Sequence, residues 1–128
     1  AATAWHQLYT RANMKIDDLD VVEVHDCFTI AELLLYEAMG LAEKGDGARA
    51  IAEGWTTKQG KLPVNPSGGL KSKGHPIGAT GVSMHVMAAM QTRGDAGALQ
   101  INGAEIAGVF NMGGSAVANY GSILEAIR

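Results

Sequence analysis

Blocks of regularly spaced hydrophobic residues predict two helices and a strand in the first part of the chain. Apolar residues recur three and four positions apart over residues 1–13, as on one face of a helix. The run 19–24 is short and rich in β-branched residues, and aspartates precede it, so it predicts a strand. Over residues 28–40 the helical spacing returns and ends at a glycine, which predicts a second helix.

The second half of the chain predicts a connection, one more helix and a hairpin. Residues 45–74 show no sustained period and many Gly, Pro, Asn and Ser residues, so they predict a long connection, and such connections are usually sites or lids. Small and apolar residues at 78–93 predict a helix that is buried nearly all round. The runs 105–110 and 116–124 predict two strands, and the Gly-Gly pair within 111–115 favours a hairpin between them.

This order of elements predicts one α/β domain over residues 1–128. Helices would pack in layers on a mixed sheet that ends in an antiparallel pair. A domain of 128 residues can bury a core without disulfide or metal support. The chain opens without a methionine and directly in helical pattern, so we expect residues 1–13 to be the tail of a truncated helix.

Composition and charge exclude several classes of protein. The formal net charge is −3 and Lys and Arg form no cluster, so we expect no nucleic-acid binding. No run approaches the ~18 apolar residues of a membrane span, and no signal peptide is recognisable. The single cysteine, Cys27, allows no internal disulfide, which is typical of a reducing compartment and predicts a cytoplasmic protein.

A thiol and two imidazoles are the first candidates for chemistry. His25 and Cys27 follow directly after a predicted strand, where ligands of α/β sheets gather, and Cys27 precedes a helix whose dipole favours a thiolate. The alternative is that Cys27 is a small buried apolar residue. His75 precedes Pro76, which restricts its backbone, so that its imidazole could serve as a base or an oxyanion donor. The alternative is an ordinary surface histidine.

The Gly113-Gly114 turn is the third candidate. Its backbone N–H groups could bind an anion or an oxyanion, and a plain hairpin turn explains it equally well. No glycine-rich segment is followed by Gly-Lys-Ser/Thr, so a phosphate-binding loop of that type is not indicated. His25, Asp26 and Cys27 are too close in sequence to form a set of metal ligands, and we expect no metal.

Three motifs in this order give the chain a resemblance to a known family. The motifs lie in 25–28, in 65–69 continuing through 73–81, and in 111–114. Their residues are His25-Asp26-Cys27-Phe28, Asn65-Pro66-Ser67-Gly68-Gly69, Lys73-Gly74-His75-Pro76-Ile77-Gly78-Ala79-Thr80-Gly81 and Asn111-Met112-Gly113-Gly114. From Leu19 to Ile127 the chain resembles the C-terminal catalytic half of thiolases, of the sterol-carrier-protein-2 type.

The resemblance implies an enzyme of lipid metabolism. Thiolases are acyltransferases of the acetyl-CoA acetyltransferase type, which cleave a 3-ketoacyl-CoA thiolytically or run the reverse Claisen condensation. The implied partner is an acyl-CoA, with the coenzyme A thioester as substrate and no bound cofactor. Family members form dimers or tetramers, so we also expect a homo-oligomer.

The resemblance also implies roles for the candidate residues. His75 would activate a nucleophilic cysteine and help to hold a thioester oxygen. Many thiolases carry a second catalytic cysteine where this chain has Asn111, and in the sterol-carrier type Cys27 takes over its role as proton shuttle. His25 would be an oxyanion-hole residue. The remaining expected residues are Gly113 as a backbone oxyanion donor and Asn111 and Gly114 as substrate contacts.

The resemblance leaves two alternatives and one gap. Thiolases place the acyl-accepting cysteine in an N-terminal half, and this chain has no cysteine besides Cys27, so the isolated chain is expected to be inactive without such a half. The first alternative is a thiolase-like retro-aldolase that acts on steroid side-chain acyl-CoA with a partner protein. The second is a non-catalytic module for oligomerisation or CoA-ester binding.

Overall fold

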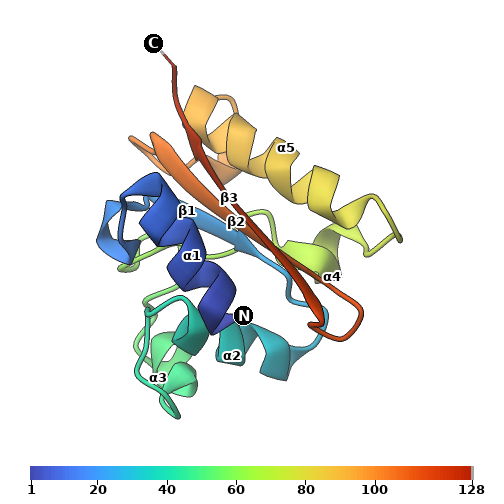
Figure 1. The fold of residues 1–128 in the computed structure, drawn as a ribbon. Coiled ribbons are helices and arrows are strands. Elements are labelled where there is room, and N and C mark those ends of the chain that lie inside the picture. The colour runs from blue at the N-terminus through green and yellow to red at the C-terminus, as the bar shows by residue number, and fades with distance from the viewer. Residues whose placement is uncertain (128) are drawn as a thin grey trace.

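The computed structural model describes residues 1–127, and a three-stranded sheet lies at its centre (Figure 1). The sheet consists of β1 (Val21–Val24), β2 (Ile106–Gly113) and β3 (Ala118–Glu125), in that order. β1 is parallel to β2, and β2 is antiparallel to β3. All four residues of β1 are buried, as expected for a parallel strand that helices cover on both faces.

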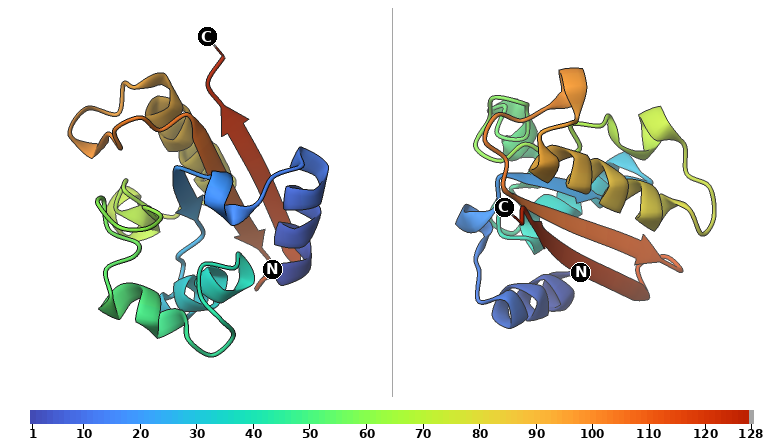
Figure 2. Two further views of the ribbon diagram at one scale, coloured as in Figure 1. Left: turned by 90° about the vertical axis from the view of Figure 1, so that its left-hand side faces the viewer. Right: turned by 90° about the horizontal axis from the view of Figure 1, so that it is seen from above.

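Helices cover both faces of the sheet, so the fold has three layers (Figure 2). Consecutive residues of β1 supply the two cores alternately: Val21 packs with Met84 and Ala88 on one face, and Val22 packs with Trp5 and Leu35 on the other. The helix on the first face is α5 (Thr80–Arg93), and those on the second are α1 (Ala2–Ala12), α2 (Thr29–Ala38) and α3 (Gly47–Ala52).

Three shorter elements complete the described chain. They are α4 (Gly69–Lys73) and the 3₁₀ turns Ile16–Asp18 and Gly97–Leu99. α4 leads into the segment 74–79, which ends at the start of α5. No helix within residues 1–127 combines the length and the apolar character that a membrane crossing requires.

The predicted fold class is confirmed. The structure is a layered α/β fold whose mixed sheet ends in the antiparallel pair of β2 and β3. The helices expected over 1–13 and 28–40 are observed as α1 and α2. The final residue of the predicted domain, Arg128, lies outside the described residues.

The prediction of a connection without elements over 45–74 was wrong in part. α3 and α4 lie in this segment, and Val64 forms a parallel bridge to Val22. The two helices have six and five residues, fewer than two turns, so their sequences are too short to show a helical period. Tertiary contacts rather than periodicity therefore define these elements.

Two predictions for the C-terminal part also need correction. α5 is not buried nearly all round, because Val82 and Val86 are 64% and 51% exposed. β2 continues through Gly113, so that the turn lies at 114–117 rather than at 111–115. Pairing with β3 holds Asn111 in the strand opposite Tyr120 despite the low strand propensity of asparagine.

Candidate functional site

His25 continues the parallel pairing beyond the end of β1. Its backbone N–H donates to the carbonyl of Phe110 at 3.0 Å. The side chain is 4% exposed, and its Nδ1 lies 2.7 Å from Oδ1 of Asn111. Its ring meets the ring of His75 edge to face, with 4.8 Å between centroids. Burial lowers the pKa of His25, the hydrogen bond to Asn111 opposes this effect, and the nearby His75 adds to it.

His75 lies in the segment that joins α4 to α5. Gly74, at φ 85°, turns the chain just before it, a backbone conformation that favours glycine. Nδ1 of His75 lies 2.7 Å from Oγ1 of Thr80, and the Thr80 hydroxyl donates to the carbonyl of Pro76 at 3.2 Å. A hydroxyl that gives its one hydrogen to Pro76 can only accept from Nδ1–H of His75, and in that arrangement Nε2 of the neutral ring is an acceptor.

A buried ion pair ties α4 to the sheet. Glu23 is 1% exposed, and its Oε2 accepts from Oγ of Ser67 at 2.7 Å and from Nζ of Lys73 at 2.9 Å. Lys73 also donates to the Ser67 hydroxyl. Lys73 is the last residue of α4, two positions before His75. The cluster therefore fixes the position at which the segment 74–79 begins.

Asp26 anchors the other end of α4. Its Oδ1 accepts from the backbone N–H of Leu70 at 2.8 Å. A Cβ at Gly69 would fall 2.0 Å from Oδ2 of Asp26, and Gly69 has φ 66°, so this position requires glycine. Asp26 therefore holds α4, the helix that precedes His75.

All six residues expected at the site line one cavity of about 1090 Å³. Cys27 is a free thiol at intermediate exposure, so its sulfur is not sealed within the core. Gly113, the last residue of β2, and Gly114, the first of the turn, form part of the same wall. The apolar remainder of the wall includes Phe28, Ala31, Ile77, Val82, Met112 and Ala116. The structure brings the predicted residues together, and their individual roles stay predictions.

Sequence reasoning did not single out Glu23, Lys73, His85 or a positioning role for Asp26. His85 also lines the cavity, with Nδ1 2.6 Å from the carbonyl of Gly81 and Nε2 3.0 Å from Oγ of Ser122. It therefore links α5 to β3. An acidic residue inside an otherwise apolar strand was the one signal that could have revealed Glu23.

Glu32 and Asn65 support the end of β1. Oδ1 of Asn65 accepts from the backbone N–H of Val24 at 2.8 Å, and its Nδ2 donates to Oε1 of Glu32 at 3.1 Å. Burial raises the pKa of Glu32, and the nearby Asp26 adds to the rise. This pair thus fixes the backbone of Val24, the residue directly before His25.

We expect Glu32→Gln to raise the free energy of unfolding at pH 7 and to change it little at pH 4. Because the pKa of Glu32 is raised above its ordinary 4.5 in the folded state, folded protein binds more protons than unfolded protein just above that pH. Its contribution to stability therefore falls as the pH rises, whereas glutamine keeps the acceptor for Asn65 without titrating. Urea denaturation at both pH values measures the difference, with the exposed Glu43→Gln as control. A variant less stable than the parent at pH 7 would contradict the expectation.

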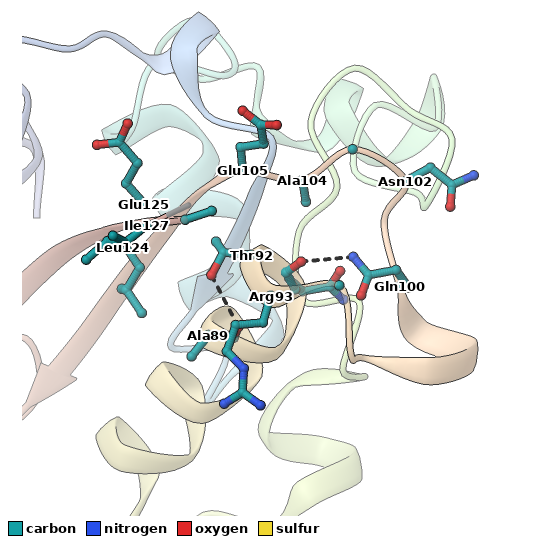
Figure 3. Close-up of a pocket in the computed structure, with 14 residues that line it drawn as sticks. Ala89, Thr92, Arg93, Gln100, Asn102, Ala104, Glu105, Leu124, Glu125 and Ile127 are labelled. Atoms are coloured by element: carbon teal, nitrogen blue, oxygen red, sulfur yellow. Dashed lines mark hydrogen bonds between the residues drawn. The ribbon is translucent and has the colours of Figure 1, made fainter.

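A second hollow lies at the opposite end of the β2–β3 pair (Figure 3). It has a volume of about 850 Å³ and is formed by the C-terminal end of α5, residues 100–105 and the end of β3. Arg93, Glu105 and Glu125 place charges of both signs around it. It includes none of the predicted site residues, all of which line the first cavity.

Comparison with known proteins shows the family to which the chain belongs. The family model described as Thiolase C-terminal domain-like matches residues 1–126. An acetyl-CoA acetyltransferase of Methanothermobacter thermautotrophicus is 49% identical over 107 residues, which are 84% of this chain and 28% of that protein. Sterol carrier protein 2 of Homo sapiens is 47% identical over 110 residues, which are 86% of this chain and 20% of that protein.

A solved structure, the Ltp2-ChsH2(DUF35) aldolase, is similar with a TM-score of 0.85 and 25% sequence identity. The similarity covers 98% of this chain and 31% of that one, so the chain spans less than a third of each of these relatives. The family match covers nearly all of the described chain, including the strand ends that carry His25 and Asn111. This chain therefore belongs to the thiolase C-terminal domain-like family.

Proposed function

We propose that this chain supplies the C-terminal part of the active site of an acyl-CoA acyltransferase. The enzyme would cleave a 3-ketoacyl-CoA with coenzyme A or run the reverse Claisen condensation. The observation that carries the proposal is that two imidazoles, 4.8 Å apart, and the half-buried thiol of Cys27 line one cavity. Membership of the family and the similarity to an acetyl-CoA acetyltransferase support the same class of reaction.

His75 is suited to activate an incoming thiol. Its hydrogen bond with Thr80 leaves Nε2 of the neutral ring as an acceptor. The proton of a nucleophilic cysteine would move to Nε2 while the sulfur attacks the thioester carbonyl and the carbonyl electron pair moves to oxygen. The imidazolium that results can donate to that oxygen, which stabilises the tetrahedral intermediate.

Cys27 would carry the proton of the carbon–carbon bond step. In the condensation direction a base removes a proton beside a thioester carbonyl, and the resulting enolate oxygen needs donors that are already in place. The backbone N–H of Gly113 would supply one of these donors and the imidazolium form of His25 the other, since both residues line the same cavity as Cys27. In the cleavage direction Cys27 would return its proton to the leaving carbon.

The acyl-accepting nucleophile would come from a thiolase N-terminal half, because Cys27 is the only cysteine among the 128 residues. Exposed apolar side chains near the cavity support a covering partner of this kind, since such surface is unfavourable in water. Among them, Phe28, Ile77 and Val82 line the cavity, while Ile30 and Leu34 lie on α2 and Val86 lies on α5. The same surface would exclude water from the reacting thioester.

We expect iodoacetamide to alkylate Cys27 rapidly at pH 7 in the folded protein. The thiol lines an open cavity at intermediate exposure, so the reagent can reach it, whereas a thiol sealed in the core would be protected. Mass spectrometry over time measures the rate, and the same protein in urea gives the rate of an unprotected thiol. Slower alkylation in the folded state than in urea would favour the non-catalytic module.

The test of the function is an assay of the chain combined with a thiolase N-terminal half. Loss of a 3-ketoacyl-CoA that depends on added coenzyme A would support the proposal, and failure of every combination to turn over this substrate would overturn it. The retro-aldolase alternative is favoured by the similarity to the Ltp2-ChsH2(DUF35) aldolase. It predicts instead cleavage of a 3-hydroxyacyl-CoA without consumption of coenzyme A.

A further inference from the structure

The amide of Asn111 is the hydrogen-bond partner of the His25 imidazole. Val24 and Phe110 are partners in the parallel pair of β1 and β2, and His25 and Asn111 each follow this pair by one residue. Paired residues of parallel strands point to the same face of a sheet, which places the amide beside the ring. The distance from Oδ1 of Asn111 to Nδ1 of His25 is 2.7 Å although the two residues are 86 positions apart in the chain.

Gly81 leaves the space in which this amide lies. A Cβ at Gly81, the second residue of α5, would be 2.9 Å from Nδ2 and 3.5 Å from Cγ of Asn111. The carbonyl of Gly81 faces Nδ1 of His85 at 2.6 Å. The Asn111 side chain is therefore confined between the backbone of α5 on one side and His25 on the other.

A neutral imidazole has one N–H, so the partner of one ring nitrogen decides what the other can do. We infer that Asn111 is a positioning residue that selects the Nδ1–H tautomer of His25, which leaves Nε2 of the neutral ring as an acceptor. His25 would then donate to an anionic oxygen only after Nε2 has gained a proton. This last step rests on the proposed function, whereas the tautomer itself does not.

This positioning role of Asn111 differs from the substrate contact that the family resemblance implies. Burial disfavours the imidazolium of His25 most, the nearby His75 ring also disfavours it, and the carboxylate of Asp26 favours it. Oδ1 of Asn111 also favours the imidazolium, because that form keeps the donor at Nδ1. Asn111 would therefore hold one hydrogen bond through both protonation states of His25.

The test is ¹⁵N NMR of the histidine ring nitrogens in the full-length protein. His25→Gln identifies the His25 signals, because only these are lost in the variant. At a pH where His25 is neutral, we expect a protonated Nδ1 and an unprotonated Nε2. In Asn111→Leu both signals should move toward the Nε2–H form, and Asn111→Asp, which can only accept, should restore the Nδ1–H pattern. Nε2–H in the parent protein, or no change in Asn111→Leu, would overturn the inference.

Two further variants separate the tautomer from damage to the fold. Gly81→Ala would displace only the end of a flexible side chain, so it should shift the His25 signals in the same direction as Asn111→Leu. Asn119→Ala is the matched control, because this asparagine of β3 donates to the carbonyl of Ala116 and lies outside the cavity wall. Its His25 signals should be unchanged. Unchanged signals in Gly81→Ala would refute the confinement of the amide.

An activity measurement separates failure of the inference from failure of the proposed function. In the enzyme assembled with an N-terminal half, Asn111→Leu should lower kcat by up to roughly 10²-fold with little change in KM, because the His25 imidazolium loses the acceptor at Nδ1 and only the weaker donor of a neutral ring is left. A rise in KM alone would assign Asn111 to substrate contact. If the NMR result holds and no assembly cleaves 3-ketoacyl-CoA, the proposed function fails and the tautomer assignment stands.

Discussion

His75→Ala is expected to lower kcat of the assembled acyltransferase by about 10³-fold, within the range that a positioned proton-transferring side chain contributes. The variant removes the acceptor Nε2, which would take the proton of the nucleophilic thiol, and with it the donor to the thioester oxygen. The helix before His75 is held by Glu23, Lys73 and Asp26, and the variant leaves their contacts in place. The loss should therefore come from chemistry and not from unfolding.

The measurement is the steady-state rate of 3-ketoacyl-CoA cleavage, together with the free energy of unfolding of each variant. His6→Ala is the matched control, because His6 is an exposed imidazole on α1 and lies outside the cavity wall. It should leave kcat unchanged. A His75→Ala enzyme within threefold of the parent rate would remove His75 from the mechanism and, with it, the assignment of the reaction.

Lys73→Met is expected to reduce the free energy of unfolding by about 3 kcal/mol or more, the usual cost of removing one partner of a buried ion pair. Glu23 is 1% exposed, so its carboxylate would be left in the core with the Ser67 hydroxyl as its remaining side-chain partner. The side chain of Lys73 is 17% exposed, so solvent screens the pair only weakly. Urea denaturation followed by circular dichroism measures the change.

Two further variants test whether the loss of stability in Lys73→Met comes from the buried ion pair. Lys71→Met removes an exposed lysine of the same helix and should change stability by at most about 0.5 kcal/mol. The double variant Glu23→Leu with Lys73→Met should recover much of the loss, because an apolar pair can replace a buried ion pair at little cost. Equal stability of Lys73→Met and Lys71→Met would show that the cluster does not hold α4.

Most of the fold could be predicted from local patterns. The valine-rich run of β1 and the helical spacing of α2 are properties of neighbouring residues, and both elements formed where the pattern predicted them. α4 could not be predicted in this way, because its five residues are held by long-range contacts such as that from Asp26 to Leu70. The two exposed valines of α5 were missed for a related reason: small residues all round the helix do not reveal which side faces the sheet.

By itself, the sequence determined which chemical groups stand at the ends of its elements: an imidazole and a thiol after a strand, and an imidazole held between glycine and proline. The tertiary structure alone decided that the two rings touch, that Glu23 is paired with Lys73, and that Asn111 faces Nδ1 of His25. Motifs follow from the order of residues along the chain, whereas the protonation of a ring nitrogen depends on its partner in space. That partner is set by the register of two parallel strands, which no local pattern encodes.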